Sequence, residues 1–204
     1  MKLKVCGMKY QDNILNVAAL QPNYMGFIFY ENSARHITTS IPVLPKTIKK
    51  VGVFVNESLE NIKNTIEKHR LDAVQLHGQE TPEFCKQLKN ERLEIIKVFS
   101  IKNKFNFEQL IPFEPFIDYF LFDTKGPNPG GNGFCFDWSV LQDYNVNKPY
   151  FLSGGIGLEQ LESLKNFKNS TAAKQCYAID INSKFELKPG LKDDIKLKNF
   201  IQQL

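Results

Sequence analysis

Short apolar segments of strand length alternate with segments of helical periodicity along the whole chain, about eight times. Most of the apolar segments are apolar on both faces, as strands are in a parallel sheet that helices cover. Strand followed by helix, repeated with short connections, favours an α/β TIM barrel, in which eight parallel strands close inside a ring of helices. A doubly wound open sheet is the alternative. The predicted strands cover residues 3–6, 24–30, 50–55, 73–77, 93–99, 117–123, 150–153 and 176–181.

The segments between these strands predict the outer helices. Ser58 caps a helix that runs to about residue 69, and Pro82 is the first residue of the next one. Residues 158–167 and 193–204 have an amphipathic spacing. Weaker patterns predict helices over 41–48, which contains two prolines, and over 105–110 and 138–141.

Length and composition describe an ordinary globular chain. Its 204 residues contain no linker-like segment, so we expect one TIM-barrel domain over residues 1–204. The net charge of +4 is small and the lysines are dispersed, which disfavours a nucleic-acid partner. No apolar leader and no apolar run of about 18 residues is present, so we expect a cytoplasmic protein without a membrane partner. The four cysteines are far apart and form no CxxC pair, which disfavours zinc sites and disulfides.

The apolar segment 117–123 ends at a carboxylate, Asp123, and a glycine- and proline-rich segment follows it. Parallel α/β folds carry their chemistry at the carboxyl ends of strands. Asp123 is therefore the first candidate for a catalytic group. The alternative is that Asp123 only caps the next turn.

In an eight-stranded barrel all strand ends meet on one face, so residues that are distant in sequence converge there. The set contains a possible base, a possible acid and a cation. Its members are Cys6, Arg35, Asn56, His77, Asp123, the Gly154-Gly155 turn and Asp180.

A phosphate site is predicted at the end of the seventh strand. The double glycine at Gly154-Gly155 lets backbone N–H groups approach an anion, and the following helix adds its positive N-terminal end. Residues 180–183, after the eighth strand, would form a second wall. Phosphate sites at these two loops recur in TIM barrels.

Cys6 and Asp123 form a candidate acid–base pair. Cysteine usually only packs in a core, but Cys6 ends a strand on the same rim as Asp123. A thiol acts as a base when nearby positive charge lowers its pKa, whereas Asp123 would need a raised pKa to act as an acid. Arg35 could bind a carboxylate or form an exposed salt bridge. His77 could orient a neighbouring group or satisfy a buried turn.

Together these motifs resemble the phosphoribosylanthranilate isomerase family of tryptophan biosynthesis. Seven segments, in the family's order, carry the resemblance over nearly the whole chain: KVCGM at 4–8, SAR at 33–35, VGVFVN at 51–56, QLHG at 75–78, Asp123 with GGNGFCFDW at 130–138, SGGI at 153–156 and DINS at 180–183.

The resemblance implies a TIM barrel that catalyses an Amadori rearrangement. N-(5-phosphoribosyl)anthranilate would become 1-(2-carboxyphenylamino)-1-deoxyribulose 5-phosphate, with Cys6 as base, Asp123 as acid and no metal or organic cofactor. The only expected partner is this small phosphosugar–anthranilate substrate, and a monomer and a homodimer are both open. The expected substrate-binding residues are Arg35, His77, Gly130, Gly131, Gly154, Gly155, Asp180, Asn182 and Ser183.

The chain departs from the family pattern after Asp180. The family commonly has two serines, a glycine and a valine there, whereas this chain has Asn182-Ser183-Lys184-Phe185. Which donors would contact the phosphate therefore stays open, and Lys184 could add positive charge.

Two other enzyme functions and one non-enzyme function are alternatives to this interpretation. A ribulose-phosphate epimerase would carry metal-binding histidines and acids at strand ends, and an indole-glycerol-phosphate synthase would carry strand-end lysines; neither pattern is visible. A barrel that binds a phosphosugar without turning it over is the non-enzyme alternative, and the presence of both Cys6 and Asp123 disfavours it.

Overall fold

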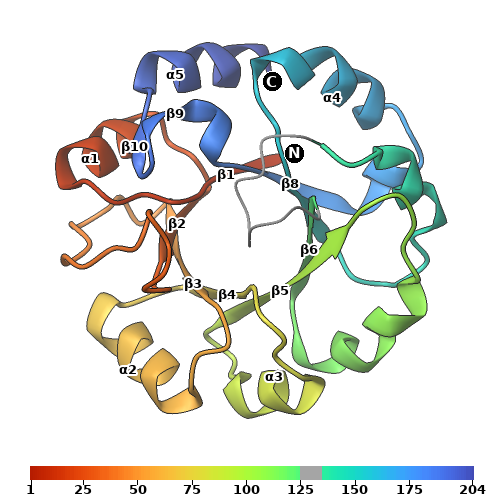
Figure 1. The fold of residues 1–204 in the computed structure, drawn as a ribbon, viewed down its shortest axis with the longest axis horizontal. Coiled ribbons are helices and arrows are strands. Elements are labelled where there is room, and N and C mark those ends of the chain that lie inside the picture. The colour runs from red at the N-terminus through yellow and green to blue at the C-terminus, as the bar shows by residue number, and fades with distance from the viewer. Residues whose placement is uncertain (125–134) are drawn as a thin grey trace.

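The computed structural model describes residues 1–124 and 135–204. Eight parallel strands follow one another around a closed barrel, and β8 pairs with β1 to complete the ring (Figure 1). The predicted TIM barrel is thus confirmed, and the alternative of a doubly wound open sheet is wrong. The strands are β1 (Lys2–Val5), β2 (Tyr24–Ile28), β3 (Lys49–Phe54), β4 (Ala73–Leu76), β5 (Glu94–Ile101), β6 (Tyr119–Thr124), β7 (Tyr150–Leu152) and β8 (Cys176–Ile181).

Helices surround the strands on the outside (Figure 1). The predicted caps are present, because Ser58 accepts from the Asn61 N–H, and Thr81 accepts from the Phe84 N–H ahead of Pro82. The α-helices are α1 (Gln11–Ala19), α2 (Leu59–His69), α3 (Pro82–Leu88), α4 (Leu161–Lys168) and α5 (Asp194–Gln203). Tighter 3-10 helices are η1 (Phe107–Phe116), η2 (Trp138–Asp143), η3 (Leu158–Gln160), η4 (Ala172–Gln175) and η5 (Ser183–Phe185).

The prediction of a helix over residues 41–48 was wrong, since this segment is irregular. Pro42 and Pro45 lack N–H donors and disfavour a helical conformation at the residues before them. Two further prolines, Pro112 and Pro115, lie within η1, which is a 3-10 helix that begins and ends later than the helix predicted over 105–110.

A short hairpin after β8 was not predicted. Strands β9 (Glu186–Lys188) and β10 (Leu191–Lys192) pair antiparallel, and Gly190 in the turn has a φ of +84°. The backbone N–H of Lys192 donates to Asn13 Oδ1, and Asn13 Nδ2 donates to the Lys192 carbonyl, at 2.7 and 2.8 Å. The hairpin is therefore anchored to α1.

The barrel interior differs between its two ends. An apolar cluster inside the strands includes Val51, Ile96 and Leu121. At the amino ends of the strands, aromatic side chains close the interior: Tyr24, Tyr119, Phe151 and Tyr177 pack on one another. Within the described residues, the aromatic side chains thus fill the barrel interior at its amino end.

Candidate active site

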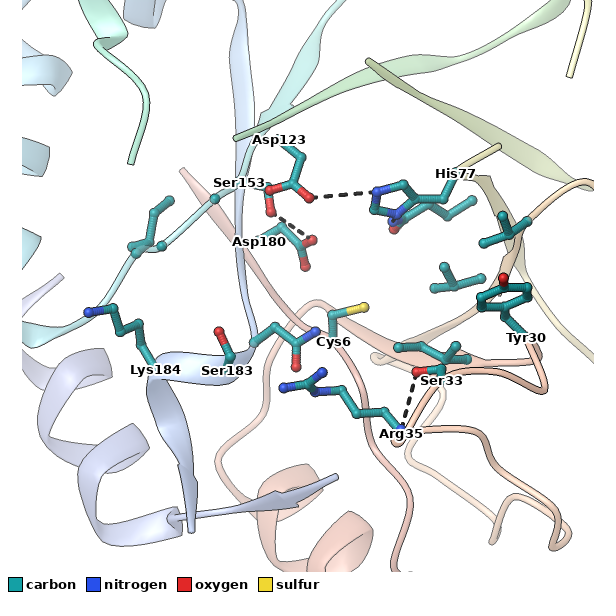
Figure 2. Close-up of a pocket in the computed structure, with 18 residues that line it drawn as sticks. Cys6, Tyr30, Ser33, Arg35, His77, Asp123, Ser153, Asp180, Ser183 and Lys184 are labelled. Carbon is teal, nitrogen blue, oxygen red and sulfur yellow. Dashed lines mark hydrogen bonds and ion pairs between the residues drawn. The ribbon is translucent and has the colours of Figure 1, made fainter. Parts of the chain in front are cut away.

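A pocket opens at the carboxyl end of the barrel (Figure 2). Its walls come from strand ends and the loops after them, which is where the barrel rule placed the site. Gly130 and Gly131 lie outside the described residues. Every other predicted site residue lines the pocket: Cys6, Arg35, His77, Asp123, Gly154, Gly155, Asp180, Asn182 and Ser183. Asn56, which was grouped with the strand ends, does not line it; it accepts the Gln79 N–H.

Cys6 directly follows β1, and its backbone N–H donates to the Ile181 carbonyl at 2.9 Å. The thiol is buried next to Gly26 of β2, where a Cβ atom would lie only 2.7 Å from Cys6 Sγ. A glycine at position 26 therefore leaves room for the sulfur. Burial raises the pKa of the Cys6 thiol, while the positive charges of Lys4 and Lys192 act to lower it.

Lys4 is fully buried directly below Cys6 on the same face of β1. Its Nζ donates to Asp180 Oδ1 at 2.8 Å, and Asp180 Oδ2 accepts from Ser153 Oγ at 3.3 Å. Burial acts to lower the pKa of Lys4, but the charges of Asp180 and Cys6 raise it above its usual value. A fixed ammonium group thus lies beside the candidate base.

Asp123 lies in β6 and is only 7% exposed. Burial raises the pKa of Asp123 to about 6; the Thr124 N–H bonded to its Oδ1 acts to lower that pKa and the charge of Asp180 to raise it. At neutral pH a small but useful fraction of Asp123 carries a proton. Figure 2 shows its carboxyl group and the Cys6 sulfur directed into the same pocket.

His77 lies beside Asp123, with its Nε2 3.6 Å from Asp123 Oδ2. Burial and the charges of Lys4 and Lys97 lower the pKa of His77 to about 4, so the ring is neutral at pH 7. Gln75 Nε2 lies 3.3 Å from His77 Nδ1; with the amide donating, the ring hydrogen sits on Nε2, facing Asp123. His77 thus lies against the carboxyl group of Asp123, and its role as an orienting group stays a prediction.

Arg35 reaches the pocket from the loop after β2. Its guanidinium forms a bidentate pair with Glu186 of β9, with Nε and one terminal nitrogen 2.9 and 2.7 Å from the two carboxylate oxygens. The pair is largely buried, with 18% and 5% of the two side chains exposed. Arg35 therefore forms a largely buried ion pair and not the exposed salt bridge that was one of the two predictions for it.

The backbone of the predicted anion cradle has positive φ angles, which glycine adopts without strain. Gly154 and Gly155 have φ values of +92° and +66°. A Cβ atom at position 154 would lie 2.1 Å from Thr124 Oγ1, so only glycine fits there. Across the pocket, Lys184 pairs with Glu159 at 2.7 Å and so links the loops after β8 and β7.

Sequence reasoning missed several buried polar residues around the pocket: Lys4, Gln75, Glu186 and Lys192. The spacing of Lys4 and Cys6 by two residues in a strand was a usable signal, because such residues share a face. Gln75 Oε1 is buried without a hydrogen-bond partner among the described residues, and it lines the pocket. Within residues 1–124 and 135–204, no three His, Cys, Asp or Glu side chains are grouped as metal ligands.

Comparison with known proteins agrees with this geometry. A family described as "N-(5'phosphoribosyl)anthranilate (PRA) isomerase" matches residues 3–203. The N-(5'-phosphoribosyl)anthranilate isomerase of Parabacteroides distasonis is 46% identical over 100% of this chain and 93% of that protein. The same enzyme of Phocaeicola vulgatus is 43% identical, over 100% of this chain and 98% of the relative.

Solved structures give the same result. The phosphoribosyl anthranilate isomerase of Thermus thermophilus has a TM-score of 0.86 at 26% identity, over 100% of this chain and 98% of that one. An isomerase solved in complex with reduced 1-(o-carboxyphenylamino)-1-deoxyribulose 5-phosphate has a TM-score of 0.80 at 30% identity, over 100% and 97%. With the family match over nearly its full length, this chain belongs to the N-(5'-phosphoribosyl)anthranilate isomerase family of enzymes.

Proposed function

We propose that the protein converts N-(5-phosphoribosyl)anthranilate to 1-(2-carboxyphenylamino)-1-deoxyribulose 5-phosphate in tryptophan biosynthesis, with Asp123 as acid and Cys6 as base. The observation that carries the proposal is the convergence of these two groups, one near the N-terminus and one past mid-chain, on one pocket beside an anion cradle. The names of the relatives, and the ligand of one solved relative, support the substrate.

In the first step Asp123 donates its proton to the ring oxygen of the ribose. The bond between C1′ and this oxygen breaks, and the nitrogen lone pair forms a C1′=N iminium. The carboxylate that remains on Asp123 accepts the Thr124 N–H at 2.8 Å and faces the Nε2–H of His77. These two dipoles stabilise the charge that develops on the acid.

In the second step the Cys6 thiolate removes the proton from C2′. The C–H electron pair forms a C1′=C2′ enolamine as the iminium nitrogen becomes neutral, and the enolamine then tautomerises to the ketone. Lys4 supplies the nearby positive charge that a buried thiolate needs. Since the iminium nitrogen accepts the electrons, these steps use no metal or organic cofactor.

Substrate binding divides between the two sides of the pocket. Arg35 would hold the anthranilate carboxylate, because a guanidinium matches a carboxylate in shape and charge. The backbone at Gly154 and Gly155 would hold the phosphate, together with Ser183 on the other wall. Lys184 is occupied by Glu159 and would add charge to the phosphate site only indirectly.

The test follows the loss of substrate fluorescence with the wild-type protein, Cys6→Ser and Asp123→Asn. Removal of a general acid or base lowers kcat by about 10²–10⁴-fold. Calorimetry with the reduced product analogue should show that both variants still bind. Full activity in either variant would refute its assigned role, and a wild-type protein that binds the analogue without turnover would be the non-catalytic barrel.

Other expectations stay predictions. No helix in the described parts of the chain is both long and apolar enough to cross a membrane. A cytoplasmic location and a single-domain chain are proposed on the sequence grounds given above. A structure of monomers generated from the dimeric isomerase of Thermotoga maritima is among the similar solved structures, at 30% identity over 100% of this chain and 97% of that one, with a TM-score of 0.76. For this chain a monomer and a homodimer are both open.

A further inference from the structure

A cluster of three charged side chains connects the pocket wall to the hairpin after β8. Arg35 donates to both oxygens of Glu186, and Lys192 Nζ donates to Glu186 Oε1 at 2.8 Å. The side chain of Glu186 is 5% exposed and that of Lys192 is 0% exposed. We call this the Arg35–Glu186–Lys192 cluster. A buried cluster of this kind is costly to desolvate and is weak evidence of a contribution to stability.

Contacts other than Arg35 hold Glu186 in place. The Gly190 N–H in the hairpin turn donates to Glu186 Oε1 at 3.0 Å. Lys192, which bonds the same oxygen, also donates to Asn182 Oδ1 at 2.7 Å. The hairpin is in turn anchored to α1 through Asn13. The carboxylate of Glu186 is therefore a fixed acceptor for the guanidinium.

The shape of the pocket wall also favours one position of Arg35. A Cβ atom at Gly7 would lie 2.9 Å from Arg35 Cδ and 2.6 Å from Asn182 Oδ1, so glycine there lets both side chains pass. Gly7 has a φ of +76°. Figure 2 shows the guanidinium extending from Arg35 toward the space between Cys6 and Ser183.

The donor count of Arg35 leaves capacity for a ligand. A guanidinium has five N–H donors. Glu186 engages the Nε–H and one terminal nitrogen. Arg35 also lines the pocket, and its other guanidinium donors have no hydrogen-bond acceptor among residues 1–124 and 135–204.

The charge balance of the cluster explains why a second cation is present. An isolated Arg–Glu pair is neutral and attracts a further carboxylate weakly. Burial lowers the pKa of Lys192 to about 8 even though Glu186 acts to raise it, so Lys192 is largely protonated at neutral pH. With Lys192, the cluster has a net charge of +1, which suits one carboxylate.

We propose that Glu186 and Lys192 are positioning residues for the carboxylate of the substrate. Glu186 fixes the orientation of the Arg35 guanidinium, and Lys192 offsets the charge of Glu186, so that Arg35 meets the ligand with an uncompensated positive charge. The β9–β10 hairpin is then part of the substrate-recognition apparatus. This inference rests on the proposed function, in which Arg35 binds the anthranilate carboxylate.

The experiment compares two ligands by calorimetry: the reduced product analogue, and the same molecule with hydrogen in place of its aromatic carboxylate. Glu186→Gln should weaken binding of the carboxylate ligand about tenfold, because a charge-assisted bidentate anchor is lost. Binding of the ligand without the carboxylate should not change. Lys192→Met should show the same selectivity, since it removes the offsetting charge while keeping the volume.

Arg35→Met and the double variant Arg35→Met/Glu186→Gln show whether Glu186 affects carboxylate binding through Arg35. Arg35→Met should abolish the preference for the carboxylate ligand, and adding Glu186→Gln should cost nothing more. In turnover, Glu186→Gln should raise KM with little change in kcat, because carboxylate binding is used equally in the ground and transition states. The matched control is Glu94→Gln, which breaks a pair with Lys49 at the other end of the barrel and should leave both dissociation constants unchanged.

The outcomes separate the two proposals. Equal weakening of both ligands by Glu186→Gln would mean a purely structural role and would overturn this inference. If Arg35→Met keeps the preference for the carboxylate ligand, the binding role of Arg35 in the proposed function is wrong instead. Should Glu186→Gln not fold, Glu186→Asp keeps the charge on a shorter stem, and it should lose part of the affinity for the carboxylate ligand alone; any other pattern refutes the inference.

Discussion

The two ends of the barrel bury polar groups in opposite ways. At the amino end, Tyr119 stacks on Tyr177 at 4.6 Å between ring centroids, and the Tyr24 hydroxyl lies 3.2 Å from Glu94 and 3.4 Å from that of Tyr177. Burial raises the pKa of Tyr24 and Tyr119, so their hydroxyls stay neutral hydrogen-bonding groups. At that end the buried hydroxyls pair with one another and with Glu94, whose charge is balanced by the partly exposed Lys49.

The carboxyl end instead collects charges. Asp123, Asp180 and the Cys6 thiol surround the buried ammonium of Lys4, and their environment shifts the pKa of Asp123 and that of Cys6 upward. A raised pKa is what Asp123 needs to act as an acid near neutral pH, whereas Cys6 needs the opposing charges of Lys4 and Lys192 to act as a base. We infer that the amino end adds to the free energy of unfolding, whereas the buried charges of the carboxyl end lower it and serve the proposed acid–base chemistry.

The largest effect is expected for Lys4→Met. Loss of the ammonium leaves Asp180 as an unpaired buried charge, which costs about 3–5 kcal/mol of unfolding free energy. It also raises the pKa of Cys6, so alkylation of this thiol, followed by mass spectrometry, should shift to higher pH, and kcat should fall about 10²-fold.

Lys97→Met is the matched control for Lys4→Met. Lys97 is a second buried lysine, paired with Glu80 at 2.8 Å outside the pocket. This variant should cost comparable stability yet leave the pH dependence of Cys6 alkylation unchanged. A parallel shift in both variants would show that general loosening, and not the ammonium, controls the thiol.

Asp123→Asn should stabilise the protein while lowering kcat by about 10²–10⁴-fold. The folded-state pKa of about 6 exceeds the usual carboxyl value, so the contribution of Asp123 to stability is fully present below about pH 4 and is lost as the pH rises through 6. At pH 7 the neutral amide should therefore gain about 2–3 kcal/mol, from two pKa units at 1.4 kcal/mol each. Urea unfolding at pH 4 and pH 7 measures this; a gain of equal size at both values would contradict it.

The tyrosine cluster should respond in the opposite sense. Tyr24→Phe removes the hydroxyl between Glu94 and Tyr177. We expect a loss of about 1 kcal/mol, seen as a decrease of about 2–4 °C in Tm. The value of kcat/KM should not change, and a decrease in it would mean that the amino end also supports catalysis.

The smallest effect is a shift in a pH profile. With the acid titrating below the base, kcat/KM should rise with pH to about 6 and then level off, and this limb reports the pKa of Asp123. In Asp180→Asn the limb should move to lower pH, because the charge of Asp180 raises that pKa. A limb that does not move would assign it to another group.

Topology explains how much of the site could be predicted from the sequence. Cys6 and Asp123 were placed together because strand ends of a barrel converge whatever their sequence separation. The cradle at Gly154 and Gly155 followed from its position after the seventh strand. These predictions needed only the order of the elements.

Pairwise contacts could not be predicted in this way. Glu186 meets Arg35 across 151 positions, and the hairpin that carries Glu186 has no strong apolar alternation. Lys4 looked like an ordinary surface lysine, since burial of an ammonium depends on the partner that the closing strand brings, here Asp180. The segment 41–48 misled because Ile41, Leu44 and Ile48 pack on the core without forming a helix, whereas Val43 is exposed. Its two prolines disfavour a helix there.

The pairing of β8 with β1 sets Lys4 against Asp180, so the last pair of strands to close the ring lies beside the proposed base, Cys6. A nascent chain that has made only the first seven strands holds the thiol but lacks the counter-ion of the lysine beneath it. During refolding, the recovery of turnover should therefore report when β8 pairs with β1. It should be slower than any signal that reports the formation of the earlier strands.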